Sequence, residues 1–225
     1  MIEPLTVAID GPSGAGKSTV GLALAMRIGA TFVDTGLMYR ALTLAALEHG
    51  VAPDDGPALR ELAERCRIEV RRPLERETDR LETMLLDGRD VTQAVRTPVV
   101  DRAVSAVSRH AEVRDAMLEV QRSAALGRAT VMVGRDIGTV VLPDATVKVY
   151  LDADPLIRAQ RRAAEMGDPS RVDEYLAEIR RRDGQDAGRD VAPLQIPDGA
   201  LVLDTGALNV DACVDAILAL LPANR

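Results

Sequence analysis

Aromatic residues and cysteines are scarce in this sequence. Its 225 residues include no tryptophan, one phenylalanine, three tyrosines and two cysteines. Cys66 and Cys213 are too few and too far apart in the chain to suggest a metal site or a disulfide framework. We therefore expect both thiols to be reduced and to lie in the core.

Long apolar runs and a signal segment are also lacking. No stretch of the sequence is apolar for long enough to span a bilayer, and the first residues show no secretory pattern. We therefore expect a cytoplasmic protein that has no membrane partner.

Positive charge is scarce as well. Lysine and arginine number 28 against 35 aspartates and glutamates, which gives a formal net charge of −7. This balance argues against a general nucleic-acid surface. The only lysines are Lys17 and Lys148, so an anionic ligand has to be bound mainly by local arginines. Genomic codon bias explains most surface arginines, although it does not explain their clustering.

A complete phosphate-binding loop of the G-x-x-x-x-G-K-[ST] type stands near the N-terminus, after the apolar run of residues 5–9. Its glycines let backbone N–H groups approach a phosphate chain, and Lys17 adds a positive charge. The helix that follows points its N-terminus at the phosphates, and the Ser18 hydroxyl can serve a Mg²⁺ ion. The expected ATP contacts are Gly11, Pro12, Ser13, Gly14, Ala15, Gly16, Lys17, Ser18 and Thr19. The alternatives are an ordinary glycine-rich turn, or a nucleotide site that regulates without catalysis.

The order of the elements predicts an α/β fold in one compact domain. Five strand-like segments alternate with helical stretches, which is typical of a parallel sheet flanked by helices. These segments are residues 5–9, 31–33, 130–133, 147–151 and 201–203.

Two segments depart from this alternation. Residues 68–92 predict short antiparallel strands, with Asp87-Gly88 as a hairpin turn, and so a small β insert. Residues 154–190 predict two amphipathic helices that carry many arginines and form a lid.

Four segments resemble the bacterial cytidylate kinase family of phosphate-loop nucleoside monophosphate kinases, in order and at matching spacing. They are residues 11–19 (GPSGAGKST), 34–40 (DTGLMYR), 134–145 (GRDIGTVVLPDA) and 181–194 (RRDGQDAGRDVAPL). The resemblance implies transfer of the γ-phosphoryl group of ATP to CMP or dCMP. We expect the donor to carry Mg²⁺ and the protein to be a monomer. It also implies a core of residues 1–34, 128–153 and 191–225, a monophosphate-binding domain of residues 35–127 that contains the β insert, and the lid.

The resemblance further implies roles for individual residues. It places Arg40 and Arg135 on the CMP phosphate, and Tyr39 among the substrate contacts. The implied cytosine pocket consists of Thr35, Arg114, Asp136 and Arg189, and the implied sugar contacts are Ser105, Arg182 and Asp186. Arg158 and Arg162, four residues apart on one helical face, are expected to reach the adenine and the ATP phosphates. The expected catalytic groups are Lys17, Arg40, Arg135, Arg162, Arg182 and Arg189.

Several alternatives stay open at this point. Arg114 could belong to a solvated helix start, Ser105 could bond to its own helix, and Arg162 could form a surface ion pair with Glu165. On the same scaffold the acceptor could be UMP, dTMP or a phosphorylated metabolite. A module that binds ATP only to switch a partner interaction is the alternative from another class.

Overall fold

The computed structural model describes residues 4–71, 73, 82–188 and 191–222. The chain divides into two compact units, Met1–Ala30 with Ala129–Arg225, and Thr31–Arg128. In the part of the chain that is described, no helix is both long and apolar enough to cross a membrane.

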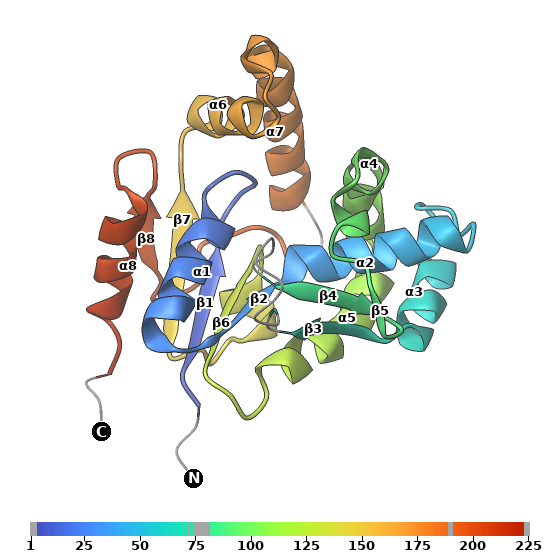
Figure 1. The fold of residues 1–225 in the computed structure, drawn as a ribbon, viewed down its shortest axis with the longest axis horizontal. Coiled ribbons are helices and arrows are strands. Elements are labelled where there is room, and N and C mark those ends of the chain that lie inside the picture. The colour runs from blue at the N-terminus through green and yellow to red at the C-terminus, as the bar shows by residue number, and fades with distance from the viewer. Residues whose placement is uncertain (1–3, 72, 74–81, 189–190, 223–225) are drawn as a thin grey trace. The chain divides into compact units, whose positions relative to one another are not determined.

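The main sheet has five parallel strands in the order β2-β6-β1-β7-β8 (Figure 1). These strands are β1 (Thr6–Asp10), β2 (Thr31–Asp34), β6 (Thr130–Gly134), β7 (Val147–Asp152) and β8 (Leu201–Asp204). The five predicted strands and the predicted α/β class are therefore confirmed. In the central strand β1, Val7, Ala8 and Ile9 are completely buried, as expected for a parallel strand covered on both faces.

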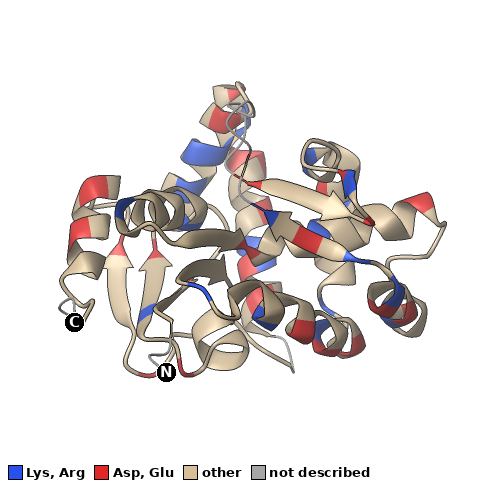
Figure 2. Ribbon diagram, turned by 60° about the horizontal axis from the view of Figure 1, so that its bottom comes forward, with Lys and Arg blue, Asp and Glu red and all other residues tan. Residues whose placement is uncertain are grey.

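The helices of the first unit extend from the ends of these strands. Helix α1 (Lys17–Ile28) packs against β6 and against α8 (Val210–Leu218), and it ends at Gly29 with a left-handed φ of 67°. A single π-helical turn, η2 (Ile137–Val141), follows β6. Charged residues are few along the sheet strands away from their ends and frequent on the helices (Figure 2).

The lid helices, α6 (Pro155–Glu165) and α7 (Val172–Ala187), belong to the first unit and are joined through η3 (Pro169–Arg171). Ala159 and Ala163 of α6 pack against Tyr175 and Ile179 of α7 in a small core of their own. The two predicted amphipathic helices are thus confirmed, whereas their movement as a lid stays a prediction.

The second unit contains the β insert. Strands β3 (Ile68–Arg71), β4 (Thr83–Leu86) and β5 (Arg89–Asp90) pair antiparallel in that order. Asp87 and Gly88 form the turn before β5 with φ angles of 52° and 81°, which confirms the predicted hairpin. Residues 72 and 74–81 of the predicted insert lie outside the described residues.

Helix α2 (Thr35–Glu48) is the centre of this unit. It packs against α3 (Gly56–Arg65), α4 (Pro98–Val107) and the short helix η1 (Ala94–Arg96). Helix α5 (Ala111–Ala125) packs against α3 and β3.

Both cysteines are free thiols. Cys213 is completely buried on α8, as expected, whereas Cys66 is only partly buried. The core interpretation is therefore wrong for Cys66, because this residue ends α3 in extended backbone just before β3.

Candidate functional site

The phosphate loop, residues 11–18, starts where β1 ends and leads into α1. Gly11 has a φ of 150°, and a Cβ atom there would lie 2.1 Å from the Leu151 carbonyl oxygen of the neighbouring strand. Only glycine therefore allows the chain to leave β1 at this point. Helix α1 begins at Lys17 with Gly16 as its N-cap residue, and no described side chain caps it. Its first N–H groups are suited to an anion.

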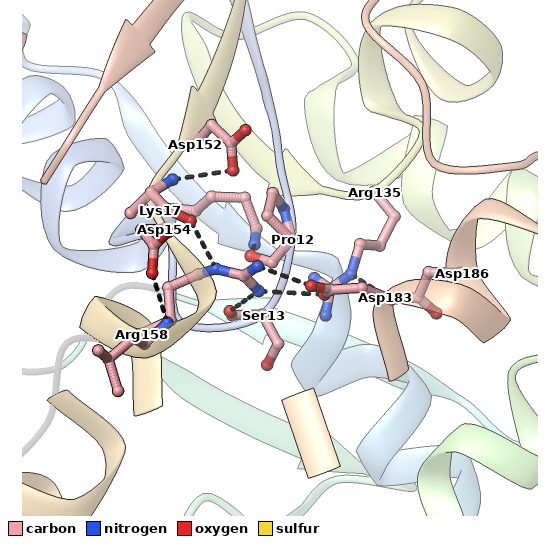
Figure 3. Close-up of polar contacts among 11 residues, drawn as sticks. Pro12, Ser13, Lys17, Arg135, Asp152, Asp154, Arg158, Asp183 and Asp186 are labelled. Atoms are coloured by element: carbon pink, nitrogen blue, oxygen red, sulfur yellow. Dashed lines mark hydrogen bonds and ion pairs between the residues drawn. The ribbon is translucent and has the colours of Figure 1, made fainter. Parts of the chain in front are cut away.

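Lys17 lies inside the loop. Its side chain folds back so that Nζ donates a 2.7 Å hydrogen bond to the Pro12 carbonyl oxygen, and the residue is 8% exposed (Figure 3). Ser18 and Thr19, in contrast, are exposed. The loop thus carries a buried ammonium group beside two accessible hydroxyl groups, a set that suits a phosphate chain and its metal ion.

Arg158 of α6 supports this loop from within the protein. Nε donates to the Ala153 carbonyl oxygen (2.9 Å), Nη1 donates to the Ser13 carbonyl oxygen (3.1 Å), and both Nη atoms bind the Asp183 carboxylate (3.1 and 2.6 Å; Figure 3). Arg158 is only 3% exposed. The guanidinium group that the sequence assigns to ATP therefore connects the residue that follows β7, the phosphate loop and α7.

The neighbouring arginines of α6 lie differently. Arg162 is half-exposed and lies 3.5 Å from the Glu165 carboxylate, the surface pair considered as its alternative. Arg161 instead approaches the phosphate loop. It donates to both the carbonyl and the hydroxyl oxygen of Thr205 (2.6 and 3.0 Å), and that hydroxyl donates to the Ala15 carbonyl oxygen (3.1 Å). Neither Arg161 nor Thr205 was predicted as a site residue, because Arg161 is one of many arginines and Thr205 lies 44 residues further along the chain.

Arg135 and Asp136 follow β6, the strand that pairs with β1. The register places Gly134 opposite Asp10, so these residues and the phosphate loop leave adjacent strands at the same edge of the sheet. Arg135 Nε donates to the Asp186 carboxylate of α7 at 2.8 Å (Figure 3), and Asp136 and Asp186 are each 6% exposed.

The arginines near the end of α7 differ in their solvent exposure. Arg182 is partly buried and lies 3.9 Å from Glu178, whereas Arg180 and Arg181 are exposed, as expected for surface charges. Arg189 lies outside the described residues.

In the second unit, α2 carries three of the predicted substrate residues. Thr35 is buried at the start of the helix. Arg40 forms an ion pair with Asp101 of α4 and donates to the Val95 carbonyl oxygen (3.2 Å). The partner acid Asp101 was missed, because only the packing of α2 against α4 brings it to Arg40. Ser105 lies half-buried on the same helix, α4.

Tyr39 and Arg114 form a stacked pair within this unit. The Arg114 guanidinium lies 5.6 Å from the centroid of the Tyr39 ring, and Nη1 donates to the Ser108 carbonyl oxygen (3.2 Å). Because Arg114 is 7% exposed, the alternative of a solvated helix start is wrong. Tyr39 is equally buried, so its ring supports the Arg114 guanidinium inside this unit.

Glu82, just before β4, is a buried carboxyl group at the β2–α2 junction. Its Oε2 accepts a hydrogen bond from the Asp34 backbone N–H (3.3 Å), and the residue is 3% exposed. Burial, and then repulsion from the Asp34 carboxylate, raise the pKa of Glu82 to about 8; the Asp34 N–H bond and Arg96 oppose this shift. The group is therefore largely protonated at neutral pH.

This shift predicts a pH dependence of stability. Between its unfolded and folded pKa values the folded state keeps a proton that the unfolded chain releases, so the free energy of unfolding falls as pH rises. From one such group the slope is about 1 kcal/mol per pH unit. We expect Glu82→Gln to remove this pH dependence. Between about pH 5.5 and 7.5, the free energy of unfolding of the wild type, measured with urea, should fall by roughly 2 kcal/mol relative to that of the variant. The exposed Glu48→Gln is the control, and parallel curves for wild type and Glu82→Gln would contradict the prediction.

The family model and the curated relatives point to the same family. The family model for cytidylate kinase matches residues 7–223. The cytidylate kinase of Caldanaerobacter subterraneus subsp. tengcongensis is 42% identical over 214 residues, which cover 94% of this chain and 92% of that protein. The cytidylate kinase of Symbiobacterium thermophilum is 44% identical over 218 residues, which cover 95% of this chain and 94% of that protein. A crystal structure of an uncharacterized protein from Eubacterium ventriosum shares the fold, with a TM-score of 0.51, 13% identity and 96% of each chain covered.

Proposed function

The chain belongs to the cytidylate kinase family, and we propose that it transfers the γ-phosphoryl group of ATP to CMP or dCMP, giving ADP and CDP or dCDP. One observation carries the proposal beyond family membership. The strand that leads into the phosphate loop pairs directly with the strand that leads into Arg135 and Asp136. A donor and an acceptor phosphate group held by these two segments would be adjacent, as direct transfer requires.

The transfer is an in-line displacement without a covalent enzyme intermediate. Lys17 and the first N–H groups of α1 balance the charge of the donor phosphates. Arg40 and Arg135 hold the acceptor phosphate, and Arg162, Arg182 and Arg189 stabilise the oxygens of the transferred group. A phosphate monoester has its second pKa near 6, so the attacking oxygen is already ionised at neutral pH. No side chain is needed as a general base.

Magnesium is proposed to enter with ATP. No cluster of three or more histidine, cysteine, aspartate or glutamate side chains that could hold a metal ion occurs among the described residues. The exposed Ser18 hydroxyl in the first turn of α1 fits a Mg²⁺ ion that takes its other ligands from phosphates and water. Held through Ser18, the ion would supply positive charge that reduces the repulsion between the donor and acceptor phosphates.

The proposed base pocket distinguishes cytosine from uracil. Asp136 accepts a hydrogen bond from the exocyclic amine of cytosine, while Arg114 donates to the ring acceptors. Thr35 and Arg189 complete the base contacts, and Tyr39 is a further substrate contact. Ser105, Arg182 and Asp186 bind the sugar. Uracil would place a carbonyl oxygen against the Asp136 carboxylate, at a cost of about 1–3 kcal/mol.

An acceptor panel tests the proposal. ADP release from ATP is measured with CMP, dCMP, UMP and dTMP, at matched concentrations and with no acceptor. We expect rapid release with CMP or dCMP, slow release with UMP and dTMP, and almost none without acceptor. Equal rates with UMP and CMP would exclude the base pocket, and release independent of any acceptor would favour a nucleotide-dependent switch. The proposed form is a cytoplasmic monomer, and sedimentation with both nucleotides checks the oligomeric state.

A further inference from the structure

Asp10, the last residue of β1, makes two short hydrogen bonds to the turn that follows the neighbouring strand β6. Its Oδ1 accepts from the Ile137 backbone N–H at 2.6 Å, and its Oδ2 accepts from the Gly138 N–H at 2.7 Å. The carboxylate is completely buried. It therefore binds two consecutive amides at the start of η2, which otherwise need partners of their own.

The space around this contact is closed. A Cβ atom on Gly138 would lie 3.2 Å from Asp10 Oδ2 and 2.9 Å from Pro197 Cγ. The backbone of η2 can approach the carboxylate this closely only because residue 138 has no side chain. The start of η2 is consequently held between Asp10 on one side and Pro197 on the other.

Asp10 stays mainly ionised at neutral pH, although burying a charge is unfavourable. Burial raises the pKa of Asp10 to about 6, and the nearby Asp136 carboxylate adds to this effect. The two backbone hydrogen bonds and the Lys17 ammonium act in the opposite direction. At neutral pH the group is still mainly ionised, and an ionised carboxylate is the form that accepts two N–H bonds at once.

The two amides bonded to Asp10 lie next to the residues of the proposed acceptor site. They directly follow Arg135 and Asp136, which the proposed function places on the acceptor phosphate and the base. Residue 10 itself directly precedes the phosphate loop. Fixing the backbone at 137 and 138 therefore restricts the directions in which the two preceding side chains leave the chain.

We propose that Asp10 is a positioning residue for the acceptor: it ties the strand that carries the phosphate loop to the turn that carries Arg135 and Asp136. It touches neither nucleotide and acts through the η2 backbone. The inference rests on the proposed function for its kinetic consequence, but the contact itself can be tested without any activity.

The test uses Asp10→Asn in the full-length chain. Asparagine keeps the size of the side chain but offers only one oxygen, and its amide group faces an N–H donor. We expect KM for CMP to rise about tenfold, as the loss of a charge-assisted hydrogen bond implies, while KM for ATP changes less than threefold. Hydrogen exchange of the Ile137 and Gly138 amides should accelerate in the free protein.

Asn209→Ala is the matched control. Asn209 caps α8 in the same unit by accepting from the Ala212 N–H at 2.8 Å, so its loss also removes a bond from a side chain to a helix amide, far from residues 135–138 in the sequence. We expect a lower melting temperature and unchanged KM values. This separates positioning from a general loss of stability.

Three results would overturn the inference. An equal rise of both KM values would mean that Asp10 shapes the phosphate loop instead, and unchanged KM values or unchanged exchange at residues 137 and 138 would mean that the contact does not hold the turn. If Asp10→Asn does not fold, Gly138→Ala strains the same contact from the other side and must give the same selective rise for CMP. A wild type inactive on CMP would contradict the proposed function, while the exchange experiment would still decide on the contact.

Discussion

Replacing Lys17 by alanine is expected to lower kcat for phosphoryl transfer by about three orders of magnitude, since a preorganised charge at the reacting group contributes roughly 10²–10³-fold or more. The protein should still fold. Within it, the ammonium group donates to the Pro12 carbonyl oxygen, and a hydrogen bond from a charged group contributes roughly 1.5–3 kcal/mol to stability. Its charge also favours the ionised form of the buried Asp10 carboxylate, so we expect a moderate fall in the melting temperature. Initial rates at saturating ATP and CMP give the effect on kcat, and thermal unfolding gives the effect on stability.

The chain provides a matched control for this experiment. Lys148 on β7 is the only other lysine, and its alanine variant should keep wild-type kcat and KM values. Activity of Lys17→Ala above a tenth of wild type would contradict the role of the phosphate loop. A strongly lowered melting temperature for Lys17→Ala alone would instead attribute the loss to folding.

The strands and turns were predictable because local physics determines them. A strand that is covered on both faces must be apolar where it is covered, as Val7, Ala8 and Ile9 are, and this pattern needs no knowledge of the neighbouring strands. The Asp87-Gly88 turn is equally local, because both residues readily adopt positive φ angles. The phosphate loop combines these two kinds of signal in a single segment.

Helical periodicity predicted less about the arginines of α6. A spacing of four residues places Arg158 and Arg162 on one face, but it does not tell which turn of the helix meets the rest of the protein. In the structure Arg158 is buried and bonded to Ser13 and Asp183, while Arg162 is partly exposed beside Glu165. The distinction depends on how α6 leaves β7, which is a tertiary property.

Acidic partners were the largest omission from the predicted site. Asp10 binds amides 127 and 128 residues away, and Asp183 lies 25 residues from Arg158. Asp101 similarly lies 61 residues from Arg40. In the sequence each is one of 35 acidic residues with nothing local to mark it. Such pairs follow from the packing of whole elements, so they can be found only once the fold is known.

The second large effect concerns the discrimination between CMP and UMP. Replacing Asp136 by alanine is expected to lower kcat/KM for CMP by about 100-fold, because it removes a buried acceptor for the exocyclic amine. KM for ATP should change less than threefold. The rate with UMP should fall much less, since uracil never gains from this carboxylate, so the ratio of CMP to UMP activity should move toward one. Initial rates with both acceptors measure that ratio.

Asp144→Ala is the control for this variant, because Asp144 is an exposed acid a few residues further along the same segment. Its kinetics should match those of the wild type. If Asp136→Ala impairs the use of CMP and of ATP equally, the substitution disrupts the turn after β6 and does not act on recognition of the base alone. An unchanged ratio of CMP to UMP would assign the discrimination to other residues, with Arg114 on its Tyr39 support as the first to test. The ratio of the two acceptors therefore separates recognition from folding, because a general loss of structure lowers both rates together.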